Sequence, residues 1–349
     1  MQSYNGRMDW TIRIQHLTLK RPFRIARGSS DWRQTVVLRI ESKGVVGWGE
    51  GAPNPRYGES PQLVMEKLES ALPHLASLNL EEREAFLEAA GAQVEGVWSA
   101  LQAVDLAVHD WWAKRQGRPL YRCLGVDPLT MPPTSMTIGI DQPQEVAPQA
   151  MEAAGFHILK LKLGSDHDRE MVQALRAVDR RPLWVDANEG WDDRELALRE
   201  IEWLARQGVG MVEQPLPAGR FEDLAWLKQR SPLPLFADES FPGGGALEPL
   251  AEAFHGVNVK LAKCGGILPA LRAMERAKAL GLKVMVGCMV ESSCGIAGAA
   301  HIAPLADLVD LDSNLYLTRD PFRGHPVVEG RITLTPLPGL GVVPVPLPE

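Results

Sequence analysis

The sequence predicts an α/β fold in two parts, a closed barrel of alternating strands and helices preceded by a smaller α+β domain. The chain has 349 residues, whereas a β/α barrel takes roughly 250, so about 100 residues remain for a second unit. After about residue 130, short apolar runs recur roughly every 25 residues, the length of one strand, one helix and two loops. Several of these runs end in a lysine or an acidic residue, which predicts a ring of charged strand ends.

The first 125 residues predict a small sheet covered by helices. Segments 10–19, 35–42 and 45–51 alternate apolar and polar residues in the manner of antiparallel strands, and 21–31 is expected to form a loop between the first two. From about Ser60 to Leu124, apolar residues recur at three-and-four spacing, which indicates helices. We therefore expect an N-terminal α+β capping domain over residues 1–125.

Residues 126–319 predict eight parallel strands with amphipathic helices between them. Because each helix supplies a crossover between neighbouring parallel strands, this pattern predicts a modified TIM barrel, (β/α)7β. Residues 320–349 contain a predicted short hairpin and are expected to return to the capping domain and complete it. The strand cores are expected within 134–140, 158–164, 182–188, 210–215, 233–240, 257–264, 283–290 and 308–314.

Composition excludes several classes of protein. A net charge of −7 without a basic run argues against a nucleic-acid partner. No apolar run approaches the roughly 20 residues of a membrane span, and the N-terminal residues lack the apolar core of a signal peptide. The four cysteines form no C-x-x-C pair, which favours a reducing compartment. We expect a cytoplasmic protein without a membrane or nucleic-acid partner.

Lys160 and Lys162 lie two residues apart on one predicted strand, so both should project into the barrel at its C-terminal end. Mutual repulsion and burial would lower their pKa values from about 10.4, which would supply a neutral amine base. The alternative, two surface lysines on an edge strand, is disfavoured by the apolar residues on both sides.

Asp186, Glu213 and Asp238 end three successive apolar runs. Buried carboxylates cost several kcal/mol each when uncompensated, so three that converge need a cation. Oxygen ligands without histidine or cysteine suit Mg²⁺ better than Zn²⁺. A structural alternative is a set of salt bridges between these carboxylates and the lysines.

A second basic strand end contains Lys260 and Lys263, and we favour Lys263 because it is nearer the expected strand end and precedes Gly265 and Gly266. If Lys162 and Lys263 approach a bound carbon from opposite faces, they can invert a stereocentre. A proton α to a carboxylate is too weakly acidic for an amine unless the enolate is stabilised, a role that fits Mg²⁺ and Lys160.

The segments KLK, VDANEGW, MVEQPLP, FADES and KLAKCGG, in this order, resemble the enolase superfamily, muconate-lactonising subgroup, over nearly the whole chain. Within that subgroup, the chain resembles the dipeptide epimerases in its D-x-D at Asp310 and Asp312 and in PFRIARGS, which contains Arg24. The resemblance implies Mg²⁺ bound by the three carboxylates, Lys162 and Lys263 as the two bases, and conversion of L-Ala-L-Glu to L-Ala-D-Glu, a 1,1-proton transfer at the C-terminal residue of a dipeptide.

The substrate contacts follow from the same comparison. Asp310 and Asp312, two apart on the eighth strand, could hold a substrate ammonium group, although a strand-end salt bridge is the alternative. Arg24, in the expected loop over the barrel, could bind the glutamate carboxylate, although a lone loop arginine is usually solvated. The resemblance also implies contacts from Thr137 and from the loop after strand seven, namely Met289, Glu291 and Ser292.

Three other functions stay open on sequence grounds. One is a dipeptide epimerase of other specificity, and another is an o-succinylbenzoate synthase or cycloisomerase, whose substrates offer no ammonium group to the D-x-D. The third is a metal-bound sensor without turnover, which the presence of both lysines disfavours. The sequence also leaves open whether copies of the chain form a homo-oligomer.

Overall fold

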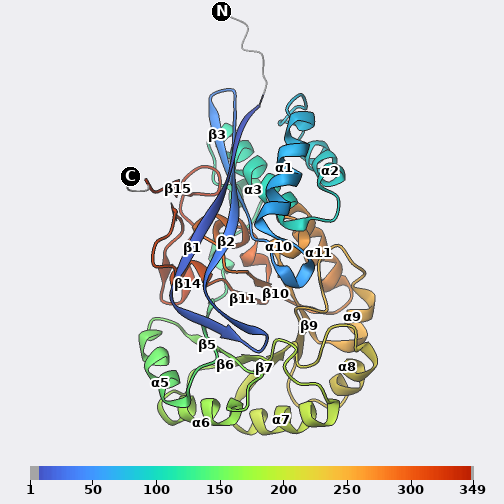
Figure 1. Ribbon diagram of the computed structural model, residues 1–349, viewed down its shortest axis with the longest axis vertical. Helices are drawn as coiled ribbons and strands as arrows, with labels where there is room; N and C mark the ends of the chain where they lie inside the picture. The colour runs from blue at the N-terminus through green and yellow to red at the C-terminus, as the bar shows by residue number, and fades with distance from the viewer. Residues whose placement is uncertain (1–7, 347–349) are drawn as a thin grey trace, which may run out of the picture.

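The N-terminal part is a three-stranded antiparallel sheet of β1 (Asp9–Ile25), β2 (Gly28–Ser42) and β3 (Val45–Gly51). The computed structural model describes residues 8–346. The loop expected over 21–31 is wrong, because β1 and β2 continue as a paired hairpin in which Arg24 lies opposite Ser29. A register shift between Thr18 and Phe23 interrupts the pairing of the two strands. In Figure 1 this blue hairpin extends from the N-terminal helices to the barrel strands.

Three helices pack on this sheet, α1 (Pro61–Leu75), α2 (Arg83–Val94) and α3 (Trp98–Arg115). The helix α3 lies directly against β3 because the facing strand positions are Gly47, Gly49 and Gly51. A Cβ atom on Gly49 would lie 2.0 Å from the carbonyl oxygen of Ala103. Backbone therefore packs on backbone here, and most residues of α3 are buried. This close packing fixes α3 between the sheet and the barrel.

Eight parallel strands form the barrel, in the spatial order β11-β10-β9-β8-β7-β6-β5-β4, as predicted. A bridge between Thr134 and Val309 brings the last strand back to the first. The strands are β4 (Ser135–Ile138), β5 (Ile158–Lys162), β6 (Leu183–Asp186), β7 (Val209–Glu213), β8 (Leu235–Ala237), β9 (Gly256–Lys260), β10 (Lys283–Gly287) and β11 (Leu308–Asp310). The expectation that the sixth barrel strand continues to Lys263 is wrong, because residues Leu261–Cys264 form the one-turn helix α10.

The crossover helices surround the barrel, with α5, α6 and α7 along its lower edge in Figure 1. Their apolar faces and the outward-facing strand residues make one large core, and a second core lies between the N-terminal sheet and its helices. The crossover helices are α5 (Pro143–Glu152), α6 (Asp168–Val178), α7 (Arg194–Arg206), α8 (Phe221–Lys228), α9 (Glu248–Ala253), α11 (Ile267–Ala279) and α12 (Ser293–Ala300).

The C-terminal segment contacts both parts of the molecule. The strands β13 (Val327–Val328) and β14 (Arg331–Ile332) form a short hairpin, and β12 (Phe322–Arg323) pairs with β15 (Val343–Pro344). The amide of Leu340 donates a 2.8 Å hydrogen bond to Asp110 on α3, and the amide of Thr134, just before β4, donates one to the carbonyl of Gly330. Across residues 8–346, no helix is both long enough and apolar enough to cross a membrane.

Candidate active site

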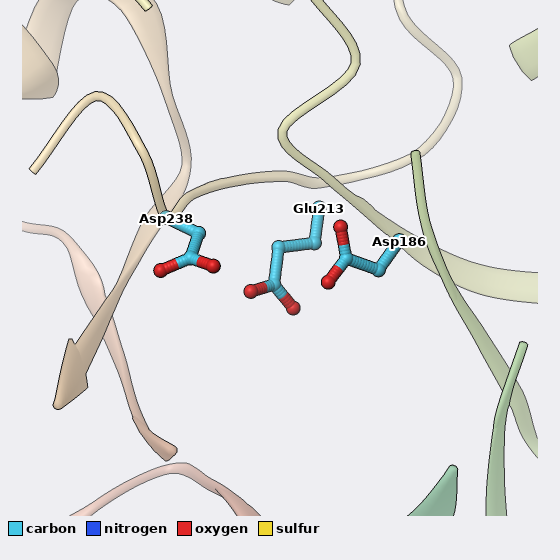
Figure 2. Close-up of side chains that lie close together, drawn as sticks. All are labelled: Asp186, Glu213 and Asp238. Atoms are coloured by element: carbon cyan, nitrogen blue, oxygen red, sulfur yellow. The ribbon is translucent and has the colours of Figure 1, made fainter. Parts of the chain in front are cut away.

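Three buried carboxylates meet where successive barrel strands end. Asp186 is the last residue of β6, Glu213 is the last residue of β7, and Asp238 directly follows β8. One carboxylate oxygen from each lies within 4.8 Å of the others, and Figure 2 shows the three groups side by side. Parallel strands place their C-terminal ends at one end of the barrel, which explains why residues far apart in sequence converge. We call this end the mouth of the barrel.

The electrostatics of this triad fit a bound cation. Burial and repulsion from Asp186 raise the pKa of Glu213 to about 7. Lys160 Nζ lies 2.6 Å from Glu213 Oε2, yet among the described residues this oxygen accepts no hydrogen bond of good geometry. The donor set is three carboxylates without histidine or cysteine, which suits a hard divalent ion such as Mg²⁺. The residues present therefore fit the predicted metal.

Lys160 and Lys162 both reach the triad from β5. The Nζ atom of Lys162 lies 2.6 Å from Asp186 Oδ2, and that of Lys160 lies 2.7 Å from Asp310 Oδ2. The expectation of a lowered pKa is wrong for Lys160. Burial does lower it, but Asp310, Glu213 and Asp186 outweigh burial and hold the pKa well above its usual value. Lys160 is therefore suited to remain an ammonium group.

Two further lysines reach the triad from the other side. Lys260 Nζ lies 2.7 Å from Asp238 Oδ2, and Lys263 Nζ lies 2.7 Å from Asp238 Oδ1. The preference for Lys263 over Lys260 is too narrow, because Asn258, two residues before Lys260, donates a 2.8 Å hydrogen bond to Glu213 and so faces inward. Strand alternation from Asn258 is the signal that would have placed Lys260 in the barrel. Lys162 and Lys263 bind opposite ends of the triad.

The D-x-D motif spans the end of β11, so the expectation that both aspartates lie on the strand is wrong. Asp310 ends the strand and accepts hydrogen bonds from Lys160 and from the Ser135 hydroxyl, at 2.7 and 2.5 Å. Asp312 accepts a 2.7 Å hydrogen bond from the amide of Thr137 and a 3.0 Å bond from the Tyr316 hydroxyl. Burial and the charge of Asp310 raise the pKa of Asp312 to about 6.

Side chains of the loop after β10 form hydrogen bonds with the N-terminal part of the chain. The sulfur of Met289 accepts a 3.4 Å hydrogen bond from Asn54, and Glu291 accepts one of 3.1 Å from Gln102 on α3. The hydroxyl of Ser292, which is completely buried, donates a 2.6 Å bond to Glu50. Of these predicted contact residues, Met289 is the one whose side chain is partly exposed.

The turn of the β1–β2 hairpin lies over the mouth. Arg24 is exposed, and its carbonyl oxygen accepts a 2.9 Å hydrogen bond from Ile140, just beyond β4. Ala26 packs so closely on Gly164 that a Cβ there would lie 2.5 Å from the Ala26 methyl group. The predicted loop position of Arg24 is therefore corrected to a strand position, still at the mouth.

A cluster of charged residues that the sequence does not predict attaches this hairpin to the barrel. Arg27, at the turn, lies 2.6 Å from Glu239 Oε1 and 3.1 Å from Glu189 Oε2. Arg56, from the loop after β3, forms a bidentate pair with Glu189 at 2.9 and 3.0 Å. Arg27 lies in PFRIARGS, the segment that also contains Arg24, but its partners lie more than 160 residues away and no sequence pattern links them to it.

Comparison with known proteins supports the same architecture. Residues 143–346 match the family model described as enolase C-terminal domain-like, and residues 8–125 match the mandelate racemase / muconate lactonizing enzyme, N-terminal domain. An L-Ala-D/L-Glu epimerase of Bacteroides thetaiotaomicron is 42% identical over 97% of this chain and 89% of its own length. An L-Ala-D/L-amino acid epimerase of Pedosphaera parvula is 39% identical over 90% and 91%.

Solved structures of other proteins also resemble this chain over nearly its whole length. A substrate-liganded L-Ala-D/L-Glu epimerase from Bacillus subtilis has a TM-score of 0.90 and 30% identity, covering 98% of this chain and 100% of its own. A dipeptide epimerase from Enterococcus faecalis, complexed with Mg and L-Leu-L-Tyr, has a TM-score of 0.90 and 30% identity over 97% and 99%. The chain thus belongs to the mandelate racemase / muconate lactonizing enzyme family of the enolase superfamily.

Proposed function

We propose that this protein is a Mg²⁺-dependent dipeptide epimerase that interconverts L-Ala-L-Glu and L-Ala-D-Glu. The observation that carries the proposal is a buried triad of carboxylates with Lys162 at one end and Lys263 at the other. Relatives that are named L-Ala-D/L-Glu epimerases and cover nearly the whole chain support it.

Asp186, Glu213 and Asp238 would hold the Mg²⁺ ion. When bound, the ion would supply positive charge to the substrate carboxylate whose α-proton is removed. Lys160, kept protonated by the carboxylates around it, would add a second positive charge at the same place. Both charges would stabilise the developing enolate, and a preorganised charge of this kind is commonly the largest contribution to rate.

Lys162 and Lys263 would act as the two bases. One amine removes the α-proton from one face of the substrate, and the ammonium on the opposite side returns a proton to the other face. Inversion needs both groups, whereas one base alone can only exchange the proton with solvent on a single face. This geometry explains how one site can handle both stereoisomers.

The remaining contacts would fix the dipeptide. Asp312 and Asp310 are proposed to hold its ammonium group, beside Thr137. Exposed Arg24 is proposed to bind the glutamate side chain, and Met289 to contact the substrate from the β10 loop. The hydrogen bonds of Glu291 and Ser292 suggest that these two residues act by holding that loop. A cytoplasmic location and homo-oligomer formation remain predictions.

Proton NMR in D₂O tests the proposal. Purified protein with Mg²⁺ and L-Ala-L-Glu should cause loss of the glutamate α-proton signal and formation of the D-Glu diastereomer, and EDTA should abolish both. Exchange with other dipeptides but not Ala-Glu would keep the mechanism and discard the role of Arg24. Absence of exchange with every dipeptide would rule out the epimerase.

A further inference from the structure

The two proposed bases are supported by different parts of the molecule. Lys162 lies on β5, which pairs with β4 on one side and with β6 on the other. Lys263 lies on the one-turn helix α10, outside the sheet. Its ammonium group donates to the carboxylate and to the carbonyl of Asp238, both at 2.7 Å. The barrel ladder therefore fixes Lys162, whereas something else must fix the backbone of Lys263.

The helix α3 of the N-terminal part contacts the backbone that directly follows Lys263. Asp105 on α3 accepts a 2.6 Å hydrogen bond from the amide of Ile267 and a 3.3 Å bond from that of Leu268. It also packs on Gly266, where a Cβ atom would lie 2.3 Å from the side chain of Asp105. Gly265 and Gly266 both have positive φ angles, +92° and +118°, so this turn has a conformation that other residues rarely adopt.

Asp105 is itself held in place and is almost completely buried. His109, one turn later on α3, lies 3.1 Å from Asp105 Oδ1. Trp98, at the start of α3, packs beside Gly265, where a Cβ atom would lie 3.2 Å from its indole ring. The opposite side of α10 is closed by Gly243, where a Cβ would lie 1.7 Å from the carbonyl oxygen of Lys263. The backbone around Lys263 and Gly265 therefore packs between α3 and the loop after β8.

We propose that Asp105 is a positioning residue for Lys263, so that the helix α3 of the N-terminal part sets the geometry of one base and not of the other. This inference rests on the proposed epimerase function. Asp105 touches neither substrate nor metal in this scheme, and it acts through the backbone of residues 265–268. An error of about 1 Å in the position of a catalytic group can lower a rate by roughly a hundredfold.

The consequence is an asymmetry between the two stereoisomers. Each base removes the α-proton of one isomer, so a displaced Lys263 should impair solvent exchange from one isomer only. Net epimerisation would fall in both directions because inversion needs both groups. Exchange of the α-proton, measured separately from L-Ala-L-Glu and L-Ala-D-Glu in D₂O, therefore distinguishes a positioning role from a merely structural one.

The test compares Asp105→Asn with Lys162→Ala and Lys263→Ala. Each lysine variant identifies the isomer that its base serves, because exchange from that isomer is lost. Asp105→Asn keeps only one acceptor oxygen, so it can accept a hydrogen bond from one of the backbone amides of 267 and 268 and must turn its NH₂ group toward the other. We expect exchange from the Lys263 isomer to fall at least about tenfold, while exchange from the Lys162 isomer stays within about twofold.

A matched control is Asp193→Asn, which alters another aspartate that caps a helix, α7, through a 2.7 Å hydrogen bond from Leu196. It should leave both exchange rates unchanged. If Asp105→Asn does not fold, as judged by circular dichroism, Trp98→Phe should produce the same asymmetry more weakly. Equal loss from both isomers, or no loss from either, would overturn the positioning role, whereas a wild-type protein without exchange would overturn the epimerase function instead.

Discussion

At the residue scale, two carboxyl groups are buried together where α12 meets the N-terminal sheet. Glu50 accepts three hydrogen bonds, from the amide and the hydroxyl of Ser292 and from the amide of Gly295. Glu291 accepts two, from the amide of Met289 and the side chain of Gln102. Burial and the nearby charge of Glu50 raise the pKa of Glu291 to about 8. Glu291 should therefore be neutral at pH 7 in the folded protein.

This assignment predicts how stability depends on pH. The pKa of Glu291 is higher in the folded than in the unfolded protein. Such a group contributes stability that is fully present below its unfolded pKa, about 4.3, and that is lost as the pH rises toward its folded pKa. Each pH unit in that interval should cost about 1.4 kcal/mol of unfolding free energy. The Glu291→Gln variant lacks this contribution. Its free energy of unfolding, measured by urea denaturation, should therefore fall less steeply than that of the wild type between pH 5 and about 8.

The exposed α2 substitution Glu88→Gln serves as the control and should follow the wild-type pH curve. Comparison of variants removes the titration of the groups that do not interact with Glu291. Parallel curves for wild type and Glu291→Gln would show that Glu291 is already ionised at neutral pH.

At the scale of elements, the β1–β2 hairpin is attached to the barrel through Glu189. This carboxylate accepts hydrogen bonds from Arg27 on the hairpin, from Arg56 on the loop after β3 and from the amide of Ala218. Its side chain is only 9% exposed, and Glu189 comes three residues after the triad residue Asp186. Two segments of the N-terminal part are thus joined to the mouth at one residue.

Removing that charge should release the hairpin. In Glu189→Gln, the bidentate pairing with Arg56 and the ion pair with Arg27 weaken, so we expect faster tryptic cleavage after Arg24 and Arg27. A looser hairpin should also raise KM for L-Ala-L-Glu several-fold with a smaller change in kcat, because substrate binding must then order the hairpin. Protease digestion followed by mass spectrometry, together with steady-state kinetics, measures both.

Glu200→Gln is the matched control, since Glu200 makes an equivalent bidentate pair with Arg169 between the outer helices α6 and α7. It should change neither the cleavage sites nor KM. Identical cleavage of wild type and Glu189→Gln would mean that the packing of Ala26 on Gly164 and Gly190 is sufficient to hold the hairpin.

The elements that the sequence predicts well are those in which local pattern and tertiary environment agree. Each of Lys162, Asp186 and Glu213 ends an apolar strand run, so its position could be predicted from the local sequence pattern alone. The hairpin turn could not, because its strands gain their order from pairing and from contact with the barrel mouth. Likewise α10 interrupts an apolar stretch that has strand character, and Asp105, which contacts its end, lies about 160 residues away.

At the scale of the whole molecule, the site joins the barrel to the N-terminal part, which has a core of its own and also contributes residues such as Leu106 to the barrel core. The barrel supplies the carboxylates and Lys162, whereas the N-terminal part places Arg24 and Arg27 at the mouth and the helix α3 behind Lys263. The C-terminal segment bonds to α3 as well, through Leu340 and Asp110. Disturbance of α3 should therefore reach the site although no residue of α3 lies in the triad.

Binding of Mg²⁺ should in turn stabilise the whole molecule. The triad comes from three strands of the barrel, and a ligand that binds only the folded state adds about 2.7 kcal/mol at a hundred times its dissociation constant. For a chain of this size, that gain corresponds to a rise of several degrees in Tm. Differential scanning fluorimetry with increasing MgCl₂, against NaCl of equal ionic strength, should show a saturable rise in Tm that EDTA reverses.

The variant Glu213→Gln keeps the shape of the side chain but removes one ligand charge, so the same rise in Tm should need much more Mg²⁺. If both proteins showed the same rise in Tm at the same MgCl₂ concentration, the ion would bind at a site other than the triad.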